Sequence, residues 1–69
     1  MNNLRFYRTE LRLPLDAMAH MTGLSRWVIR AIELGFRKAL PDEETRICSC
    51  LGYSVREVFP ETKMTVGAQ

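Results

Sequence analysis

The side chains that could carry out chemistry in this chain are few, and most of them form no reactive set. The chain has one histidine, His20, and two cysteines, Cys48 and Cys50, spaced as C-x-C. Two thiols and one imidazole fall short of the four ligands of a structural zinc site. Cysteines two positions apart on a helix also point to different faces. We therefore expect no metal site, and two small, largely buried thiols in a reducing compartment.

A run of three carboxylates, Asp42 to Glu44, follows Pro41. Proline in the first turn and acidic residues beside it are typical of the positively charged start of a helix. This pattern indicates helix-start residues rather than an acid–base pair. Because the chain also lacks a glycine-rich phosphate loop, we expect no enzymatic activity, no cofactor and no small-molecule ligand.

Two arginines have more specific chemistry. Arg26 and Arg30 are four positions apart and would share one face of a helix. Guanidinium groups donate two parallel hydrogen bonds to guanine or phosphate, although a solvated helix surface is the plain alternative. Trp27 lies off the apolar stripe of Ile29 and Ile32, so we expect it in a DNA groove or on a protein interface rather than in the core.

The elements that must position these residues are five short helices. An apolar stripe begins at Leu4 and ends before Pro14, which disfavours helix at the residue preceding it. Further helices are expected over 15–22, 26–34, 41–51 and 55–59. Ser25 and Ser54 are good N-caps, whereas the glycines at 23, 35 and 52 are natural helix ends. No segment alternates as a strand would, so the fold class is all-α.

Charge divides the chain into two halves. Residues 1–40 carry seven basic and three acidic side chains, a net of +4, whereas residues 41–69 carry a net of −2. A basic front half and an acidic back half suit one surface that faces a polyanion and another that faces away. A mixed, solvated surface is the alternative.

The 69 residues allow one small domain, which we place at residues 1–60, with a polar tail at 61–69 that is flexible or associated with a dimer. A domain of this size is only marginally stable, and dimerisation is a common support. No apolar run approaches the ~20 residues needed to cross a bilayer, and the N-terminus resembles no signal peptide. These features predict a cytoplasmic protein without membrane contact.

The turn between the second and third helices is the most informative segment. Ala19 is small enough for two helices to approach closely, and Gly23 can take up a left-handed conformation without strain. Leu24, Ile29 and Ile32 would anchor the following helix to the core and leave its other face outward. This pattern is typical of a helix-turn-helix, whose second helix enters the major groove of DNA.

The chain as a whole resembles the Cro/C1-type, or XRE-type, helix-turn-helix domain of phage repressors and restriction–modification controllers. The resemblance extends from Leu4 to about Pro60. The features that carry it are Leu4 and Arg8, Met18-Ala19, Gly23-Leu24-Ser25, Ile29, Ile32-Glu33, Gly35, Ile47, Leu51-Gly52 and Val58-Phe59. It implies a lambda-repressor-like domain of five helices and an internal ion pair between Arg8 and Glu33.

The resemblance also implies a function: a sequence-specific transcriptional regulator that binds double-stranded DNA as a homodimer on a palindromic operator. Base contacts are then expected from the third helix, and phosphate contacts from the helix starts and the following loop. The candidates for base contact are Arg26, Trp27, Arg30 and Ala31; those for phosphate contact are Leu15, Ser25, Arg37 and Lys38; those for the dimer interface are Tyr53, Val55 and Phe59. Phe6, Phe36, Met64 and Val66 are further apolar candidates for a dimer surface.

The sequence departs from the family pattern where the second helix begins. The family has a Ser or Thr cap followed by Gln, and here the positions hold Pro14 and Leu15, with Asp16 next. Leu15 can offer a phosphate only the backbone N–H groups of the helix start. An antitoxin-like or adaptor module with the same fold, with Trp27 on a protein interface, is the alternative, and salt-dependent duplex binding separates the two.

Overall fold

The computed structural model describes residues 2–61, which form five helices and no strand. The helices are α1 (Leu4–Glu10), α2 (Leu15–Thr22), α3 (Arg26–Leu34), α4 (Pro41–Leu51) and α5 (Val55–Val58). The all-α class and the five helices expected from the sequence are confirmed. No helix within this range is long and apolar enough to span a bilayer. Nearly all of the predicted tail, including Met64 and Val66, lies outside the described residues.

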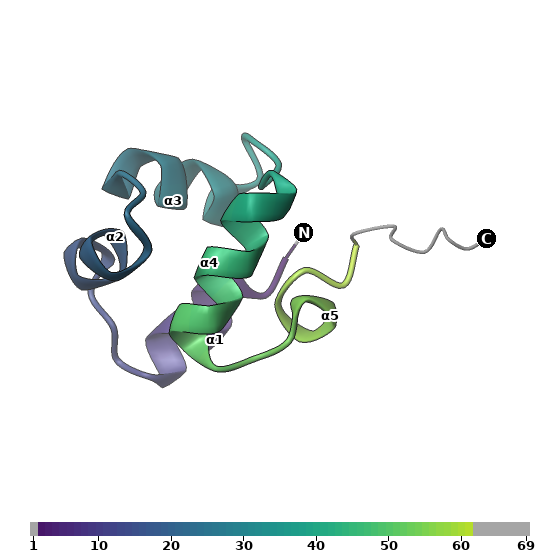
Figure 1. The fold of residues 1–69 in the computed structure, drawn as a ribbon, viewed down its shortest axis with the longest axis horizontal. Helices are drawn as coiled ribbons and strands as arrows, with labels where there is room; N and C mark the ends of the chain where they lie inside the picture. Colours follow the sequence, from purple (N-terminus) through teal and green to yellow (C-terminus); the bar gives the residue numbers. More distant parts are fainter. Residues whose placement is uncertain (1, 62–69) are drawn as a thin grey trace.

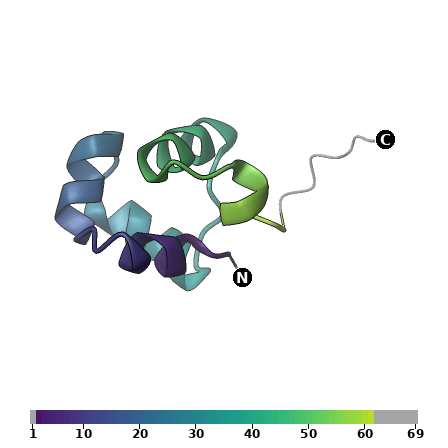
Figure 2. The same cartoon turned by 90° about the horizontal axis from the view of Figure 1, so that it is seen from below.

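The helices enclose one core, with α2 and α3 crossing steeply. Figure 1 shows α2 nearly end-on, whereas α3 runs across the view. Seen from below, α1 and α4 lie on opposite sides of the domain, with α2 at one end and α5 at the other (Figure 2). The turn between α2 and α3 depends on Gly23, which has a φ of 77°. Ser25 then caps α3 by accepting a hydrogen bond from the Val28 backbone N–H. This is a helix-turn-helix.

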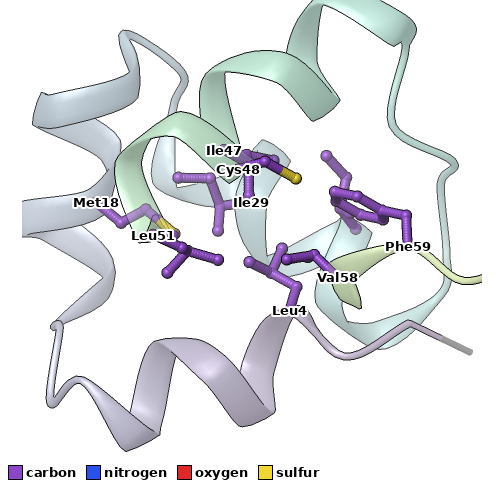
Figure 3. Packing of buried hydrophobic residues seen from close by; sticks show 9 residues of the cluster. Leu4, Met18, Ile29, Ile47, Cys48, Leu51, Val58 and Phe59 are labelled. Atoms are coloured by element: carbon purple, nitrogen blue, oxygen red, sulfur yellow. The ribbon is translucent and has the colours of Figure 1, made fainter. Parts of the chain in front are cut away.

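The core draws side chains from all five helices. Apolar residues at helical spacing meet in the centre because each short helix offers only one apolar stripe. Figure 3 shows the buried cluster, which consists of Leu4, Met18, Ile29, Ile32, Ile47, Cys48, Leu51, Val58 and Phe59.

One dimer candidate has to be corrected from this packing. Phe59 is only 5% exposed, so its ring is part of the core and cannot also cover a partner. The sequence placed it at the end of α5, where a helix of only four residues can bury its apolar side chains against α4 and α1. Tyr53 and Val55 are half-buried beside it.

The first helix ends earlier than the proline at position 14 requires. Arg12 adopts a φ of 56°, the left-handed conformation that closes many helices and that glycine adopts most easily. The Leu13 N–H then donates to the Arg8 carbonyl, 3.0 Å away, and the Arg12 N–H donates to the Thr9 carbonyl. No sequence pattern indicated this turn, because arginine is an uncommon residue in that conformation.

A buried ion pair joins α1 to α3. The Arg8 Nε donates to Glu33 Oε2 at 2.5 Å, and its Nη1 donates to the Leu13 carbonyl at 2.7 Å. The Glu33 side chain is 0% exposed and that of Arg8 is 10% exposed. The ion pair implied by the resemblance is therefore present, and it also holds the connection between α1 and α2.

Arg8→Ala should strongly destabilise the domain, because it leaves the Glu33 carboxylate buried without a partner. Removing one member of a buried pair costs roughly 3–5 kcal/mol, a large part of the ~5–15 kcal/mol available to a typical domain. Thermal and urea unfolding followed by circular dichroism measure the loss. Arg12→Ala is the matched control, because it removes the same charge from an exposed position. Equal, small losses in both variants would contradict the structural role of the pair.

Candidate functional site

The outward face of α3 carries the side chains that the sequence singled out. Ile29, Ile32 and Glu33 are buried and fix the helix to the core. Since successive residues are rotated by about 100°, the opposite face is left to solvent. On it lie Arg26, Trp27 and Arg30, which are exposed, and Ala31, which is half-buried.

Arg26 lies between a carboxylate and an aromatic ring. Its Nη1 is 3.2 Å from Asp16 Oδ1, in the first turn of α2, and its guanidinium carbon is 5.6 Å from the centre of the Trp27 ring. The side chains of Arg26 and Asp16 are 53% and 74% exposed. An exposed pair of this kind contributes about 0–1 kcal/mol, so Arg26 can exchange Asp16 for another acceptor at little cost.

Trp27 is 75% exposed. The structure thus excludes a core position for this side chain and leaves the groove and protein-interface alternatives. An indole in water is unfavourable, since burial of apolar area is worth about 25 cal/mol per Å². The side chain is therefore available for contact with another molecule.

The remaining cations divide into free and paired groups. Arg30 on α3 and Lys38 in the loop after it are exposed, and neither forms an ion pair within residues 2–61. Arg37, by contrast, donates from both terminal nitrogens to the Glu43 carboxylate, at 2.9 and 2.8 Å. The sequence predicted phosphate contacts from both Arg37 and Lys38. In the structure Arg37 is bound to Glu43 and constrains its own loop, whereas Lys38 forms no ion pair among the described residues.

Glu43 is a residue whose role the sequence did not reveal. Its Oε1 also accepts the Leu40 N–H at 2.9 Å, and the residue is 8% exposed. The hydrogen bonds from Arg37, and next that from Leu40, hold the pKa of Glu43 below its usual value, while the carboxylate raises the pKa of Arg37. The one sequence signal that could have indicated this capping contact is the position of Glu43, three residues after the N-cap of α4.

The other two candidates for phosphate contact lie at helix starts. Leu15 is half-buried and packs against the core, so only its backbone can face a ligand. No side chain caps this end of α2. Ser25 is exposed and its Oγ accepts the Val28 N–H at 3.1 Å. Its hydroxyl hydrogen remains free to donate, because an N-cap serine uses only its acceptor capacity.

Arg46 is a second residue that sequence reasoning missed. From α4 its Nη1 donates to the Thr22 carbonyl at 3.4 Å, while its Nε lies 3.0 Å from Asp42. It therefore braces the end of α2 at the turn that leads into α3. Only the four-residue spacing of Asp42 and Arg46 was visible in the sequence, and that spacing does not indicate the contact with α2.

The cysteines have no reactive environment. Burial raises the pKa of Cys48 to about 11, with Glu44 and Glu57 adding to the shift, and burial also raises the pKa of Cys50. The described part of the chain contains no cluster of metal-ligating side chains.

The dimer candidates do not form one exposed surface. The Tyr53 ring packs on Tyr7, with ring centres 4.1 Å apart, and Val55 packs against the core. With Phe59 buried, this region offers a partner only the outer edges of two half-buried side chains.

Comparison with protein-family models, curated proteins and solved structures found no match for this chain. The class that the fold defines is a five-helix domain with a helix-turn-helix at α2 and α3. Its outward helix face combines two arginines with an exposed tryptophan.

The contact of Glu43 predicts a pH dependence of stability. A carboxyl whose pKa is lowered in the folded state stabilises the protein above its unfolded pKa of about 4.5, and this contribution is lost as the pH falls through the folded value. The melting temperature of Glu43→Gln should therefore lie furthest below that of the unsubstituted chain near neutral pH. The difference between the two melting temperatures should shrink as the pH falls below about 4.5 and then through the lower pKa of Glu43 in the folded protein.

Thermal melts at a series of pH values give the comparison. Glu10→Gln serves as the control, since Glu10 is exposed and has no ion-pair partner among the described residues. A gap for Glu43→Gln that is as small as that for Glu10→Gln, or that does not change with pH, would show that the Arg37 contact does not hold in solution.

Proposed function

We propose that the protein is a sequence-specific DNA-binding transcriptional regulator that reads base edges in the major groove with the outward face of α3. One observation carries the proposal: α3 is anchored by buried residues on one face and presents Arg26, Trp27 and Arg30 on the other, directly after a helix-turn-helix turn. A helix held in this way is the element that enters a major groove, whose base edges match the hydrogen-bond donors of arginine.

The three outward residues take different roles in this proposal. Arg30, with no carboxylate partner among the described residues, donates to guanine O6 and N7 without first breaking an ion pair. Arg26 exchanges Asp16 for a base or phosphate. Trp27 packs on sugar or a thymine methyl, since apolar contact with that methyl is a form of base readout.

Phosphate contacts flank this helix. Lys38, the Ser25 hydroxyl and the N–H groups at the start of α2 are the available donors, whereas Arg37 is already held by Glu43. Asp16 lies at the same end of α2 and would repel a phosphate there. Backbone attraction is therefore modest, and more of the affinity comes from base contacts.

A single domain of this size contacts few base pairs, so useful specificity requires two copies on half-sites one helical turn apart. The proposal therefore includes a homodimer on a palindromic operator in the cytoplasm, as in a repressor or a controller. The second candidate is a protein-interaction module, antitoxin-like or adaptor, and the exposure of Trp27 is the observation that favours it.

Arg30→Ala and Lys38→Ala should weaken DNA binding in different ways. After selection of a bound duplex from a random pool, Arg30→Ala should cost ~1–3 kcal/mol on that duplex and little on a scrambled one, because it removes a base contact. Lys38→Ala should weaken both duplexes alike and reduce the salt slope by about 0.9 for each phosphate that the lysine no longer neutralises.

Titrations at several salt concentrations measure both effects. Arg56→Ala on α5 is the control, because Arg56 is also exposed and forms no ion pair within the described residues. If Arg56→Ala lowers binding as much as Arg30→Ala, general charge rather than the face of α3 is responsible for the affinity.

Trp27→Ala distinguishes the two candidate functions. If the indole lies in the groove, its removal should reduce affinity mainly for duplexes with A·T pairs in the half-site, because its contribution is packing without a hydrogen bond. Affinity for each singly substituted operator gives this profile. An unchanged profile, together with unchanged operator binding by Arg30→Ala, would favour the protein-interaction module.

A further inference from the structure

The start of α3 meets the start of α2 through an ion pair whose acidic member has no part in the base contacts proposed above. Asp16 Oδ1 lies 3.2 Å from Arg26 Nη1, and the Asp16 side chain is 74% exposed. The first turn of α2 offers no other polar side chain, because the neighbours of Asp16 are Pro14, Leu15 and Ala17. The carboxylate therefore belongs to the same outward surface as the arginine.

A carboxylate on this surface opposes DNA binding unless it finds a partner there. Phosphates repel it, and when Arg26 turns to a base, Asp16 loses its hydrogen-bond donor. An ionised carboxylate can only accept hydrogen bonds. In the major groove the groups that donate are the N4 amino group of cytosine and the N6 amino group of adenine, whereas guanine and thymine present only acceptors. A base edge that replaces the lost donor must therefore carry an amino group.

The two side chains together match one base pair. A G·C pair presents guanine O6 and N7 as acceptors and, beside O6, the cytosine N4 amino group as a donor. Because O6 and N4 share a hydrogen bond of the base pair, they lie about 2.9 Å apart. The donor of Arg26 and the acceptor of Asp16 are 3.2 Å apart, so each can face its complement on the same pair.

The other base pairs fit less well. An A·T pair also has an amino group beside a carbonyl oxygen, but thymine O4 offers the arginine one acceptor where guanine offers two. A reversed C·G pair sets the amino group against the arginine and the acceptors against the carboxylate. Each wrong pair thus leaves one of the two charged side chains without its full set of partners.

We propose that Asp16 determines specificity for a G·C base pair: its carboxylate accepts from cytosine N4 while Arg26 donates to the guanine of the same pair. This inference rests on the proposed DNA-binding function. In the free protein the two side chains satisfy each other, and on DNA each takes up the complementary atoms of the base pair. Asp16 adds discrimination chiefly by penalising the wrong pairs.

Affinities of the full chain and of Asp16→Ala for the selected operator and its single-base-pair variants test this role. The unsubstituted chain should prefer G·C at one position of each half-site. Asp16→Ala should reduce that preference about tenfold, because it removes one charge-assisted hydrogen bond, and Arg26→Ala should reduce the preference at the same position. Glu10→Ala is the matched control: it removes the same charge from an exposed residue of α1 and should leave every preference unchanged.

A modified operator isolates the contact itself. Pyrimidin-2-one in place of the cytosine at that position lacks the N4 amino group. This replacement should weaken binding of the unsubstituted chain about tenfold and binding of Asp16→Ala much less, as a double-mutant cycle requires of two groups in contact. An aspartate that only stabilises the start of a helix affects the melting temperature and neither of these results.

Two results would overturn the role of Asp16 and leave the DNA-binding function standing. In the first, Asp16→Ala keeps the base preferences of the unsubstituted chain, whether or not its affinity for all duplexes rises. In the second, Asp16→Ala and Arg26→Ala change the preference at different positions. A chain that selects no duplex from the random pool refutes the DNA-binding function and, with it, the role of Asp16.

Discussion

The arrangement of the domain depends on the contacts of the Arg8 guanidinium. It binds Glu33 near the end of α3 and the Leu13 carbonyl just before α2, so a single side chain of α1 fixes two other elements. Glu33 follows Ile32 directly, and the two residues are buried side by side. The depth at which α3 sits in the core, and hence which of its residues reach solvent, is set by this contact together with Ile29 and Ile32.

Once α3 is fixed, the other charges are distributed around it. Arg46 braces the turn before the helix, and Arg37 with Glu43 closes the loop after it. These arginines are structural, although by sequence alone they look like any other positive charge. Because Arg8 is bound to Glu33 and Arg37 to Glu43, the basic excess of residues 1–40 overstates the charge available to a polyanion. Lys38 and Arg30 remain as cations close to the outward face of α3 that form no ion pair within the described residues.

The sequence predicted the five helices well, because most of their ends are marked locally by a proline, a serine cap or a glycine. It also predicted which face of α3 is buried, because Ile29 and Ile32 define a stripe. The contacts of Arg26 with Asp16 and of Arg37 with Glu43 were not predictable, since pairing depends on how whole elements pack. Phe59 was misplaced for the same reason: whether a short terminal helix buries its ring depends on the space between α1 and α4, which no local pattern describes.

The two ends of α3 thus have different surfaces. Its start is polar and adaptable: Arg26 rests between Asp16 and Trp27 in an exposed pair that costs about 0–1 kcal/mol to open. Its end carries exposed apolar side chains, Leu34 and Phe36, and leads into a loop that the contact of Arg37 with Glu43 closes. A surface that must match hydrogen-bond donors to base edges gains from side chains that can reorient, because each base presents a different pattern. The proposed base readout would therefore use the adaptable start of α3, while the loop after its end stays fixed by the contact of Arg37 with Glu43.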